Sequence, residues 1–213
     1  MKKKQHLFIT IEGGEGSGKT TQSLLLKKYL EQKGYEVLLT REPGGTVLAE
    51  SMRRILLNPS SNLVPLSELF LYEAARAQHV EEFVLPALKT GKVVICDRFI
   101  DATMAYQGYG RKLSLSLINR LNIIASFGLM PMLTIYLDIK PSRGLNKAKK
   151  LNKESYVGIG DRIERESMQF HNDVRNGYLS QAGKYPKRIK IVETQKTPKN
   201  TQAIIRKIID TVL

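Results

Sequence analysis

Residues 7–20 read LFITIEGGEGSGKT, a short apolar run that ends in glycines and is followed by a helical pattern. Within it, residues 13–20 match GxxxxGK(S/T), the phosphate-binding loop that joins a strand to a helix. Glycines let the backbone turn its N–H groups around phosphate oxygens, and the positive end of the helix dipole faces them. Lys19 is placed for the β and γ phosphates, and the Thr20 hydroxyl for Mg²⁺. The predicted nucleoside triphosphate site comprises Gly13, Gly14, Glu15, Gly16, Ser17, Gly18, Lys19 and Thr20.

Beyond this loop, strand-like and helix-like segments alternate along the chain, a pattern typical of an α/β fold with a parallel sheet. The expected strands are 7–12, 36–40, 92–96, 132–138 and 188–193. The expected helices are 20–33, 46–57, 66–89, 114–127, 161–182 and 200–213, with a disturbance of the third helix at Pro86. The sequence therefore predicts the P-loop NTPase three-layer fold, in which helices flank a five-stranded parallel sheet.

The chain has 213 residues, of which 42% are hydrophobic and 25% are charged, as in an average globular domain. This length allows one domain, and we expect residues 1–213 to form it. No apolar run approaches the ~18 residues of a membrane span, and no signal-peptide cleavage site follows residues 1–12. The single cysteine, Cys96, lies in an apolar run and has no partner for a disulfide. We therefore expect a cytoplasmic protein with a buried cysteine.

The formal net charge is +14, which raises the question of nucleic-acid binding. The excess is uneven, because residues 141–213 contain 16 basic and 7 acidic residues. Residues 143–153 include five basic side chains and no acidic one. The glycine-punctuated segment 140–160 is therefore the candidate insert, between a strand and a helix. Its charge is either a solvated helix face or a contact for a polyanion.

A phosphate loop indicates a nucleotide but not the reaction, so the acceptor must be identified from other segments. These are Glu12, REPGGT at 41–46, Arg53, YEAAR at 72–76, DRFIDATMAYQG at 97–108 and DRIE at 161–164. In these segments the chain resembles bacterial thymidylate kinases, and the resemblance spans essentially the whole sequence. It implies that ATP and Mg²⁺ are used to phosphorylate dTMP to dTDP in dTTP synthesis. It also implies a homodimer, and we expect neither nucleic acid nor membrane as a partner.

The resemblance assigns roles in the acceptor site. Arg53 and Arg98 match positions that bind the 5′-phosphate, a task that suits the planar fork of guanidinium. Arg76 matches a donor to thymine O4, and Tyr72, four residues earlier on the same helix face, matches an aromatic that stacks on the base. The implied dTMP-binding residues are Glu42, Pro43, Arg53, Tyr72, Arg76, Arg98, Thr103, Tyr106 and Gln107.

Two carboxylates, Asp97 and Asp138, end apolar strands and are candidates for directing Mg²⁺. The resemblance favours Asp97, because its strand should lie beside the strand of the phosphate loop. We expect Asp138 to cap the segment that follows it. Thr20 and Asp97 are therefore the predicted metal-site residues.

The acceptor phosphate is already ionised at neutral pH, so this transfer needs positioning and charge neutralisation rather than a strong base. The residues assigned to catalysis are Lys19, Glu12, Arg98 and Lys149. Because loop positions 14–17 contain no base, we expect the segment 140–160 to act as a lid that supplies a cation. The candidates are Lys147, Lys149, Lys150 and Lys153, with Arg143 and Arg162.

Two alternatives stay open. The first is a P-loop kinase that phosphorylates a deoxynucleoside. Arg53 and Arg98 argue against it, because such an acceptor has no phosphate for them to bind. A nucleotide switch or DNA-associated ATPase would use the +14 charge, but residues 146–149 lack the aspartate of a guanine-reading motif and no DNA-reading module is evident. Steep salt dependence of duplex binding would favour this second alternative.

Overall fold

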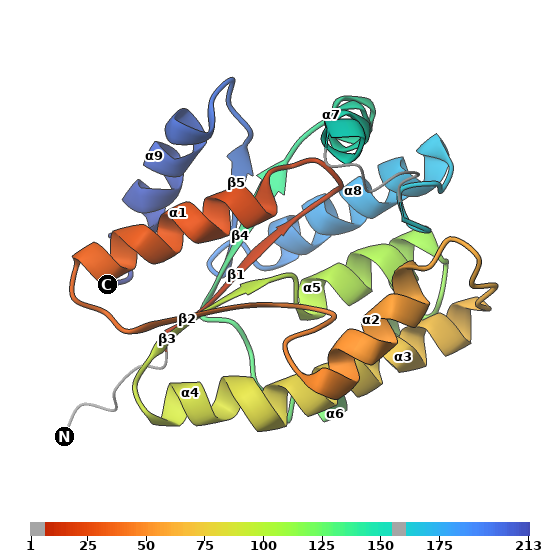
Figure 1. Cartoon of the computed structure of the whole chain (residues 1–213), viewed down its shortest axis with the longest axis horizontal. Coiled ribbons are helices and arrows are strands. Elements are labelled where there is room, and N and C mark those ends of the chain that lie inside the picture. Colours follow the sequence, from red (N-terminus) through yellow and green to blue (C-terminus); the bar gives the residue numbers. More distant parts are fainter. Residues whose placement is uncertain (1–6, 155–160) are drawn as a thin grey trace.

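The structure, a computed structural model, describes residues 7–154 and 161–213, without the side chains of 151–154. Its centre is a five-stranded sheet in the order β2-β3-β1-β4-β5, in which each paired strand is parallel to its neighbour. The strands are β1 (Phe8–Gly13), β2 (Val37–Arg41), β3 (Val93–Asp97), β4 (Leu133–Asp138) and β5 (Ile189–Glu193). Helices lie on both faces of the sheet (Figure 1), so the predicted fold class is confirmed.

Nine α-helices and two π-helical segments lie within the described residues. The α-helices are α1 (Lys19–Gln32), α2 (Val47–Leu57), α3 (Pro65–His79), α4 (Leu85–Lys89), α5 (Ile100–Thr103), α6 (Leu115–Ala125), α7 (Pro141–Glu154), α8 (Met168–Lys184) and α9 (Pro198–Ile209). The π-helical segments are η1 (Val80–Val84) and η2 (Met104–Gly110).

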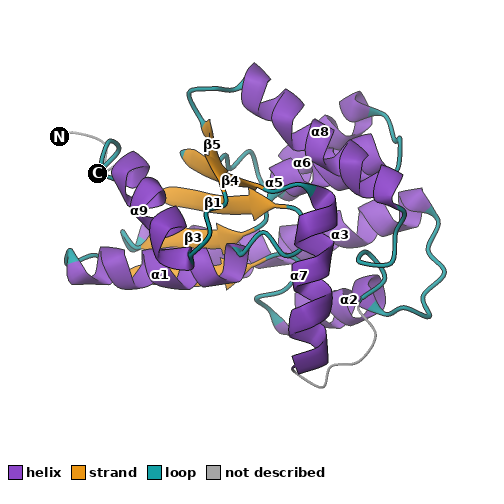
Figure 2. Cartoon of the chain, turned by 90° about the horizontal axis from the view of Figure 1, so that it is seen from above, coloured by secondary structure: helices purple, strands orange, loops and turns teal. Residues whose placement is uncertain are grey.

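The central strands are buried on both faces, as expected for a parallel sheet between helices. Alternate side chains of β1 and β3 enter two different cores. Ile9 and Ile95 pack with α1 and α9, whereas Phe8 and Cys96 pack with η1 and α4. Cys96 has no exposed surface, which confirms that it is a buried residue. Figure 2 shows the carboxyl ends of the strands pointing toward the side where α7 and α2 lie.

The predicted disturbance near Pro86 is present, and another predicted helix begins later than expected. The helix expected over 66–89 leaves α-helical geometry at Val80, six residues before Pro86, and runs through the π-helical turn η1. Proline has no N–H and its ring crowds the carbonyl four residues back, so the preceding turn widens. The helix expected from residue 161 begins only at Met168, because the Ser167 hydroxyl accepts a hydrogen bond from the Phe170 amide (3.1 Å) and caps it.

The segment 140–160, for which the sequence suggested only a basic insert, begins with the helix α7. Its buried side chains Leu145 and Ala148 are three residues apart and share one face, while Lys147, Lys149 and Lys150 are exposed. Residues 155–160 lie outside the described part of the chain. Within the described residues, no helix combines the length and apolar character of a membrane span.

Candidate functional site

The phosphate loop joins β1 to α1 and is built from glycines with positive φ. Gly16 has φ 65° and Gly18 has φ 93°, values in the left-handed region that glycine adopts without a Cβ clash. The Ser17 hydroxyl is buried and has no hydrogen-bond partner among the described residues. Lys19 donates to the Gly14 carbonyl (3.0 Å), and burial lowers the pKa of its ammonium. A buried hydroxyl, a buried ammonium and turned amides together form a cradle for phosphate oxygens.

The predicted metal-site residues lie together. The Thr20 hydroxyl at the start of α1 donates to Oδ2 of Asp97 at the end of β3 (3.0 Å). Hydroxyl and carboxylate oxygens are ligands that Mg²⁺ accepts, usually with waters and substrate phosphates completing its shell. No group of three or more His, Cys, Asp or Glu side chains that could hold a metal is present in residues 7–154 and 161–213. The two oxygens therefore fit a metal held jointly with the nucleotide.

Asp138 behaves differently from the prediction that it caps the next segment. Its carboxylate accepts two hydrogen bonds from Arg175 of α8 (2.8 and 2.7 Å) and one from the Tyr136 hydroxyl (3.1 Å). The reason for preferring Asp97 also needs correction, because both β3 and β4 lie beside β1. What separates the two carboxylates is their partners: Asp97 contacts the loop hydroxyl, and Asp138 is paired with an arginine.

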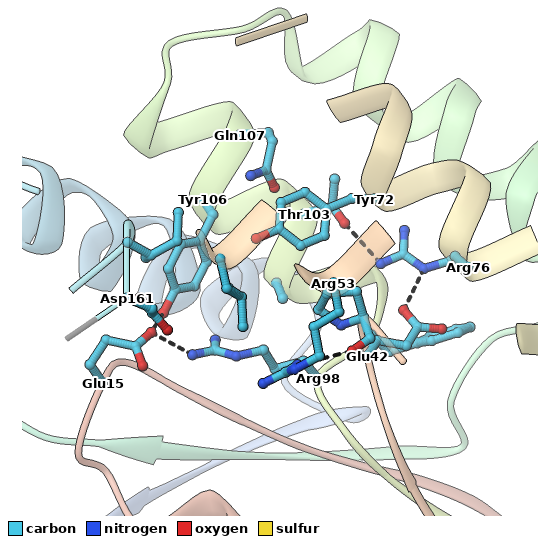
Figure 3. Close-up of a pocket in the computed structure, with 15 residues that line it drawn as sticks. Glu15, Glu42, Arg53, Tyr72, Arg76, Arg98, Thr103, Tyr106, Gln107 and Asp161 are labelled. Atoms are coloured by element: carbon cyan, nitrogen blue, oxygen red, sulfur yellow. Dashed lines mark hydrogen bonds and ion pairs between the residues drawn. The ribbon is translucent and has the colours of Figure 1, made fainter. Parts of the chain in front are cut away.

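A pocket opens beside the phosphate loop, and Glu15 of that loop contributes to its lining. All nine residues assigned to dTMP by resemblance line it, although they come from five regions of the chain. Figure 3 shows Arg53, Arg98 and Glu42 along one side of this pocket and Tyr72, Thr103 and Gln107 across from them. The full lining is Glu15, Glu42, Pro43, Arg53, Leu57, Tyr72, Arg76, Arg98, Phe99, Ala102, Thr103, Tyr106, Gln107, Asp161 and Ile163.

Arg98 lies between the phosphate loop and this pocket. Its φ is 73°, an unusual value for a residue with a Cβ, and such strain is often found at functional sites. One guanidinium nitrogen is 2.6 Å from Glu15, and the Cζ atom lies 4.8 Å from the Tyr106 ring centroid. The Tyr106 hydroxyl also donates to Glu15 (2.7 Å). Burial alone would raise the pKa of Glu15, but Arg98 and Lys19 lower it to about 2.

This geometry changes the assignment of Glu15. The sequence placed it among the ATP-binding residues, because it belongs to the loop. Its backbone remains in the loop, but its carboxylate reaches Arg98 and Tyr106 and lines the acceptor pocket. An acceptor phosphate that binds Arg98 must therefore compete with, or lie beside, this carboxylate.

Glu12 does not line the pocket, which argues against the direct catalytic role expected for it. It has no exposed surface, and its carboxylate accepts hydrogen bonds from the Phe99 amide (2.7 Å) and the Tyr178 hydroxyl (2.8 Å). Burial, helped by the nearby Asp101, raises the pKa of Glu12 to about 8. Phe99 directly follows Arg98, so the Glu12 side chain holds the backbone turn that presents the Arg98 guanidinium.

Arg76 is 2% exposed and is held by four side chains. Its nitrogens donate to Glu42 (2.8 Å), Glu73 (3.0 Å), Asn122 (2.6 Å) and Thr103 (2.9 Å). An arginine has five N–H donors, so these bonds leave one for a ligand in the pocket that Arg76 lines. The Thr103 hydroxyl, expected beside the base, thus also helps to orient Arg76.

The other predicted acceptor residues are arranged around these two arginines. Arg53 of α2 donates to the Pro43 carbonyl (2.9 Å), which holds the guanidinium near the end of β2. Tyr72 extends from α3 into the pocket, and Gln107 of η2 lies across from Arg98 (Figure 3). The amide nitrogen of Gln107 donates to Glu68 (2.8 Å), a residue outside the predicted set.

The described lid lysines, Lys147, Lys149 and Lys150, do not line the acceptor pocket. Helix α7 meets the phosphate loop where two glycines approach closely, since a Cβ at Gly16 or at Gly144 would overlap the backbone of the other segment. Lys149 is exposed on this helix and does not line the acceptor pocket. The side chain of Lys153 lies outside the described residues. The structure thus brings the first turns of α7 against the phosphate loop.

Comparison with known proteins shows which family this chain belongs to. A family model described as thymidylate kinase matches residues 11–205. The chain is 46% identical over 203 residues to a thymidylate kinase of Synechococcus sp. (strain JA-3-3Ab), covering 95% of each chain. It is 50% identical over 191 residues to that of Syntrophotalea carbinolica, covering 89% of this chain and 88% of the relative. The chain belongs to the thymidylate kinase family.

A solved structure supports the same relationship. The crystal structure of a thymidylate kinase from Ehrlichia chaffeensis is 37% identical and superposes with a TM-score of 0.77. The alignment covers 96% of this chain and 98% of that one. The thymidylate kinase fold therefore extends over nearly all of the sequence.

Within this thymidylate kinase fold, several residues that matter to the site were not predicted from the sequence. Phe99, Asp161 and Ile163 line the pocket, and Glu68 and Tyr178 hold residues that do. One signal was available: DRIE at 161–164 belongs to the family resemblance, and it could have pointed to Asp161 and Ile163. No sequence pattern joins Glu68 to Gln107, because they are 39 residues apart and meet only across packed helices.

Proposed function

We propose that this protein transfers the γ-phosphoryl group of ATP to dTMP and forms dTDP for dTTP synthesis. The observation that carries this proposal is the arrangement of the acceptor pocket. Arg53 and Arg98 lie on one side of it, and Arg76 and Gln107 contribute polar groups to other parts of its lining. The first pair suits a phosphate, and the second pair suits the edge of a pyrimidine. Family membership supports the same reaction.

In this proposal, Arg53 and Arg98 bind the 5′-phosphate of dTMP, and the remaining N–H of Arg76 donates to thymine O4. Tyr72 stacks on the base, while Glu42, Pro43, Thr103 and Tyr106 shape the rest of the pocket. The bidentate fork of guanidinium fixes the direction of the acceptor phosphate as well as its position. A dTMP phosphate oxygen is thereby held toward the phosphate loop, where the donor binds.

The chemical step is an in-line displacement at the γ-phosphorus, in which a dTMP phosphate oxygen forms the new P–O bond and ADP leaves. Lys19, the loop amides and Ser17 bind the phosphates of ATP and stabilise charge that develops in the transition state. Thr20 and Asp97 would hold Mg²⁺, which supplies further neutralisation of phosphate charge when bound. The acceptor oxygen is already ionised, so no residue needs to remove a proton from it.

We assign the remaining positive charge to the segment 140–160, which acts as a lid on a single domain of residues 1–213. The contact of α7 with the phosphate loop at Gly16 and Gly144 supports this role. Because a helix turns by about 100° per residue, Lys147 and Lys149 flank the buried Ala148, whereas Lys150 lies on the opposite side. Lys149 remains our candidate for the catalytic cation.

The proposal is tested by measuring ADP release with a panel of nucleoside monophosphates. We expect dTMP to give the highest kcat/KM, dUMP to follow, and dCMP and purine nucleotides to be poor acceptors. Thymidine without its phosphate should be inactive, because Arg53 and Arg98 then have no anion to bind. Equal use of dCMP and dTMP, or good use of thymidine, would contradict the proposal.

We also propose a homodimer formed through the face that α3 and α6 share. Phe70 of α3 is 51% exposed, and Ile123 and Ile124 of α6 are 51% and 68% exposed. Large apolar side chains on neighbouring helices favour burial against a second copy. Light scattering should give twice the mass of the 24.1 kDa chain, and Phe70→Asp with Ile124→Asp should give a monomer.

A cytoplasmic location completes the proposal. The chain has one cysteine, Cys96, which is fully buried, so a reducing compartment suits it. Fractionation of cells that produce the protein should place it with the cytoplasmic enzymes.

A further inference from the structure

Glu68 of α3 is a buried carboxylate behind the wall of the acceptor pocket. It has no exposed surface and does not itself line the pocket. Oε1 accepts hydrogen bonds from the Gln107 amide nitrogen (2.8 Å) and from Nε of Arg111 (3.1 Å). Oε2 accepts from a second nitrogen of Arg111 (3.1 Å) and forms an ion pair with Arg162 (2.6 Å). This carboxylate therefore links its own helix, α3, to residues 107–111 and to Arg162, which are far apart in the sequence.

The charge state of Glu68 follows from these partners. Burial alone would raise the pKa of this carboxyl, but the hydrogen bonds from Arg111 and Gln107 outweigh it and lower the pKa. Glu68 is therefore ionised at neutral pH, and an ionised carboxylate can only accept hydrogen bonds. The group of Gln107 that faces Glu68 must then be the NH₂ and not the carbonyl.

This constraint decides what Gln107 offers to a ligand. Gln107 is 2% exposed and lines the acceptor pocket. Because its nitrogen is turned toward Glu68, the carbonyl Oε1 is the end of the amide that faces away from Glu68 and is available to the pocket. A carbonyl attracts the N3–H of thymine or uracil and repels the N3 lone pair of cytosine. Without a fixed partner, a glutamine amide can rotate and present either group.

We propose that Glu68 is a positioning residue that sets base selectivity, because it holds the Gln107 amide with its carbonyl toward the acceptor base. This inference rests on the proposed function and extends it to a residue that does not touch the substrate. Glu68 acts through Gln107 and accounts for discrimination between bases that carry N3–H and cytosine. It is not required for recognition of the 5′-phosphate.

The same carboxylate also holds the chain segment that follows the lid. Arg162 pairs with Glu68, and it donates through Nε to the Leu56 carbonyl (3.0 Å). Its backbone amide donates to the Leu57 carbonyl (3.1 Å). The neighbouring residues Asp161 and Ile163 line the pocket. Glu68 thus fixes the base-reading amide and one wall of the pocket at once.

The test compares Glu68→Gln with Glu166→Gln. Glu166 provides a matched control, because it pairs with Arg111 (2.6 Å) but has no bond to Gln107 among the described contacts. The measured quantity is the ratio of kcat/KM for dTMP to kcat/KM for dCMP. We expect Glu68→Gln to lower this ratio roughly 10- to 100-fold, mainly through faster use of dCMP and a higher KM for dTMP. Glu166→Gln should keep the ratio within about twofold of wild type.

A second arm separates positioning from general damage. Gln107→Met removes the amide, so adding Glu68→Gln in that background should change the selectivity ratio much less than it does in the wild-type background. If Glu68→Gln does not fold, Glu68→Asp keeps the charge for Arg111 and Arg162 but withdraws the carboxylate from Gln107 by one methylene. We expect Glu68→Asp to give a ratio between those of wild type and Gln107→Met.

The outcomes distinguish this inference from the proposed function. If wild-type protein does not prefer dTMP to dCMP, the proposed function fails. If wild-type protein prefers dTMP but the Glu68 variants keep the wild-type ratio, the inference about Glu68 is wrong. It is also wrong if Glu68→Gln lowers the ratio equally with and without the Gln107 amide.

Discussion

The donor and acceptor sites lie on either side of Arg98 but are built by different means. The donor site is mainly a backbone structure, in which glycines with positive φ let the loop turn its amides inward. The acceptor site is a side-chain structure, in which buried charges are paired, as Arg76 is with Glu42 and Glu68 is with Arg111. A triphosphate needs many N–H donors at short range, whereas a base needs a few groups in fixed directions.

This difference predicts which substitutions each site is sensitive to. Substitutions in the loop should weaken the neutralisation of phosphate charge and lower turnover, with little effect on acceptor recognition. Changes in the buried network should alter selectivity and stability with little effect on ATP. The two residues that join the sites, Arg98 and Glu15, are paired at 2.6 Å. The following predictions test this division, beginning with the largest effect expected on turnover.

Lys19→Ala should lower kcat by ~10³-fold or more, because Lys19 neutralises phosphate charge in the transition state. It should leave dTMP affinity and the thermal midpoint close to wild type, since its ammonium bonds only to the Gly14 carbonyl among the described contacts. Steady-state kinetics, calorimetric titration with dTMP and a melting curve measure the three quantities. Near-normal turnover would remove Lys19 from the mechanism.

The lid lysines provide a test of the charge at the donor site. Single Lys→Ala changes at 147, 149, 150 and 153 should be unequal, with one or two lowering kcat by ~10²-fold and the others nearly silent. Lys150→Ala should be among the silent ones, because position 150 lies opposite the buried face of α7. Turnover is measured at saturating ATP and dTMP. If all four variants and the quadruple variant keep normal turnover, the positive charge must come from Arg143 or Arg162.

Arg76→Lys probes the acceptor side while keeping a charge beside Glu42 and Glu73. A lysine lacks the planar fork, so it cannot satisfy both carboxylates and donate to a base at once. We expect kcat/KM for dTMP to fall by an amount that corresponds to ~1 to 3 kcal/mol, with the KM for ATP unchanged. An equal rise in the KM for dTMP and the KM for ATP would show that the acceptor and donor sites do not respond separately to substitution.

Glu12→Gln should have the smallest effect on turnover and a clear effect on the pH dependence of stability. The pKa of Glu12 is about 8 in the folded protein and 4.5 ordinarily, so the folded state holds more protons between these values. Stability contributed by this group is present below pH ~4.5 and is lost as pH rises toward ~8. Glutamine removes that loss, so the variant should gain up to a few kcal/mol relative to wild type at pH 8.

Denaturant unfolding at pH 5 and pH 8 measures this effect, with wild-type protein in parallel. The glutamine should still accept a hydrogen bond from the Phe99 amide, so Arg98 stays in position and activity persists. A variant with the same pH slope as wild type would mean that Glu12 does not titrate in this range. A loss of activity with unchanged stability would return Glu12 to a direct role in catalysis.

Much of the fold was predictable because its signals are local. The loop at residues 13–20 lies between a strand and a helix in the sequence, and it does so in the structure. All five predicted strands are present, and α2 ends at Leu57, just before Pro59, as expected. The nine residues assigned to the acceptor all line one pocket, but they were assigned through family resemblance rather than from local patterns.

The sequence by itself determined the phosphate loop, the order of the five strands, and the family. These depend on glycine conformations, apolar periodicity and short motifs, which act over a few residues. Only the tertiary structure decided that the Glu15 carboxylate faces the acceptor, that Glu12 is buried behind Arg98, and that Glu68 holds Gln107. The partners in these bonds are 83, 87 and 39 residues apart. A polar side chain finds its hydrogen-bond partner only when the packing of distant elements brings the two together.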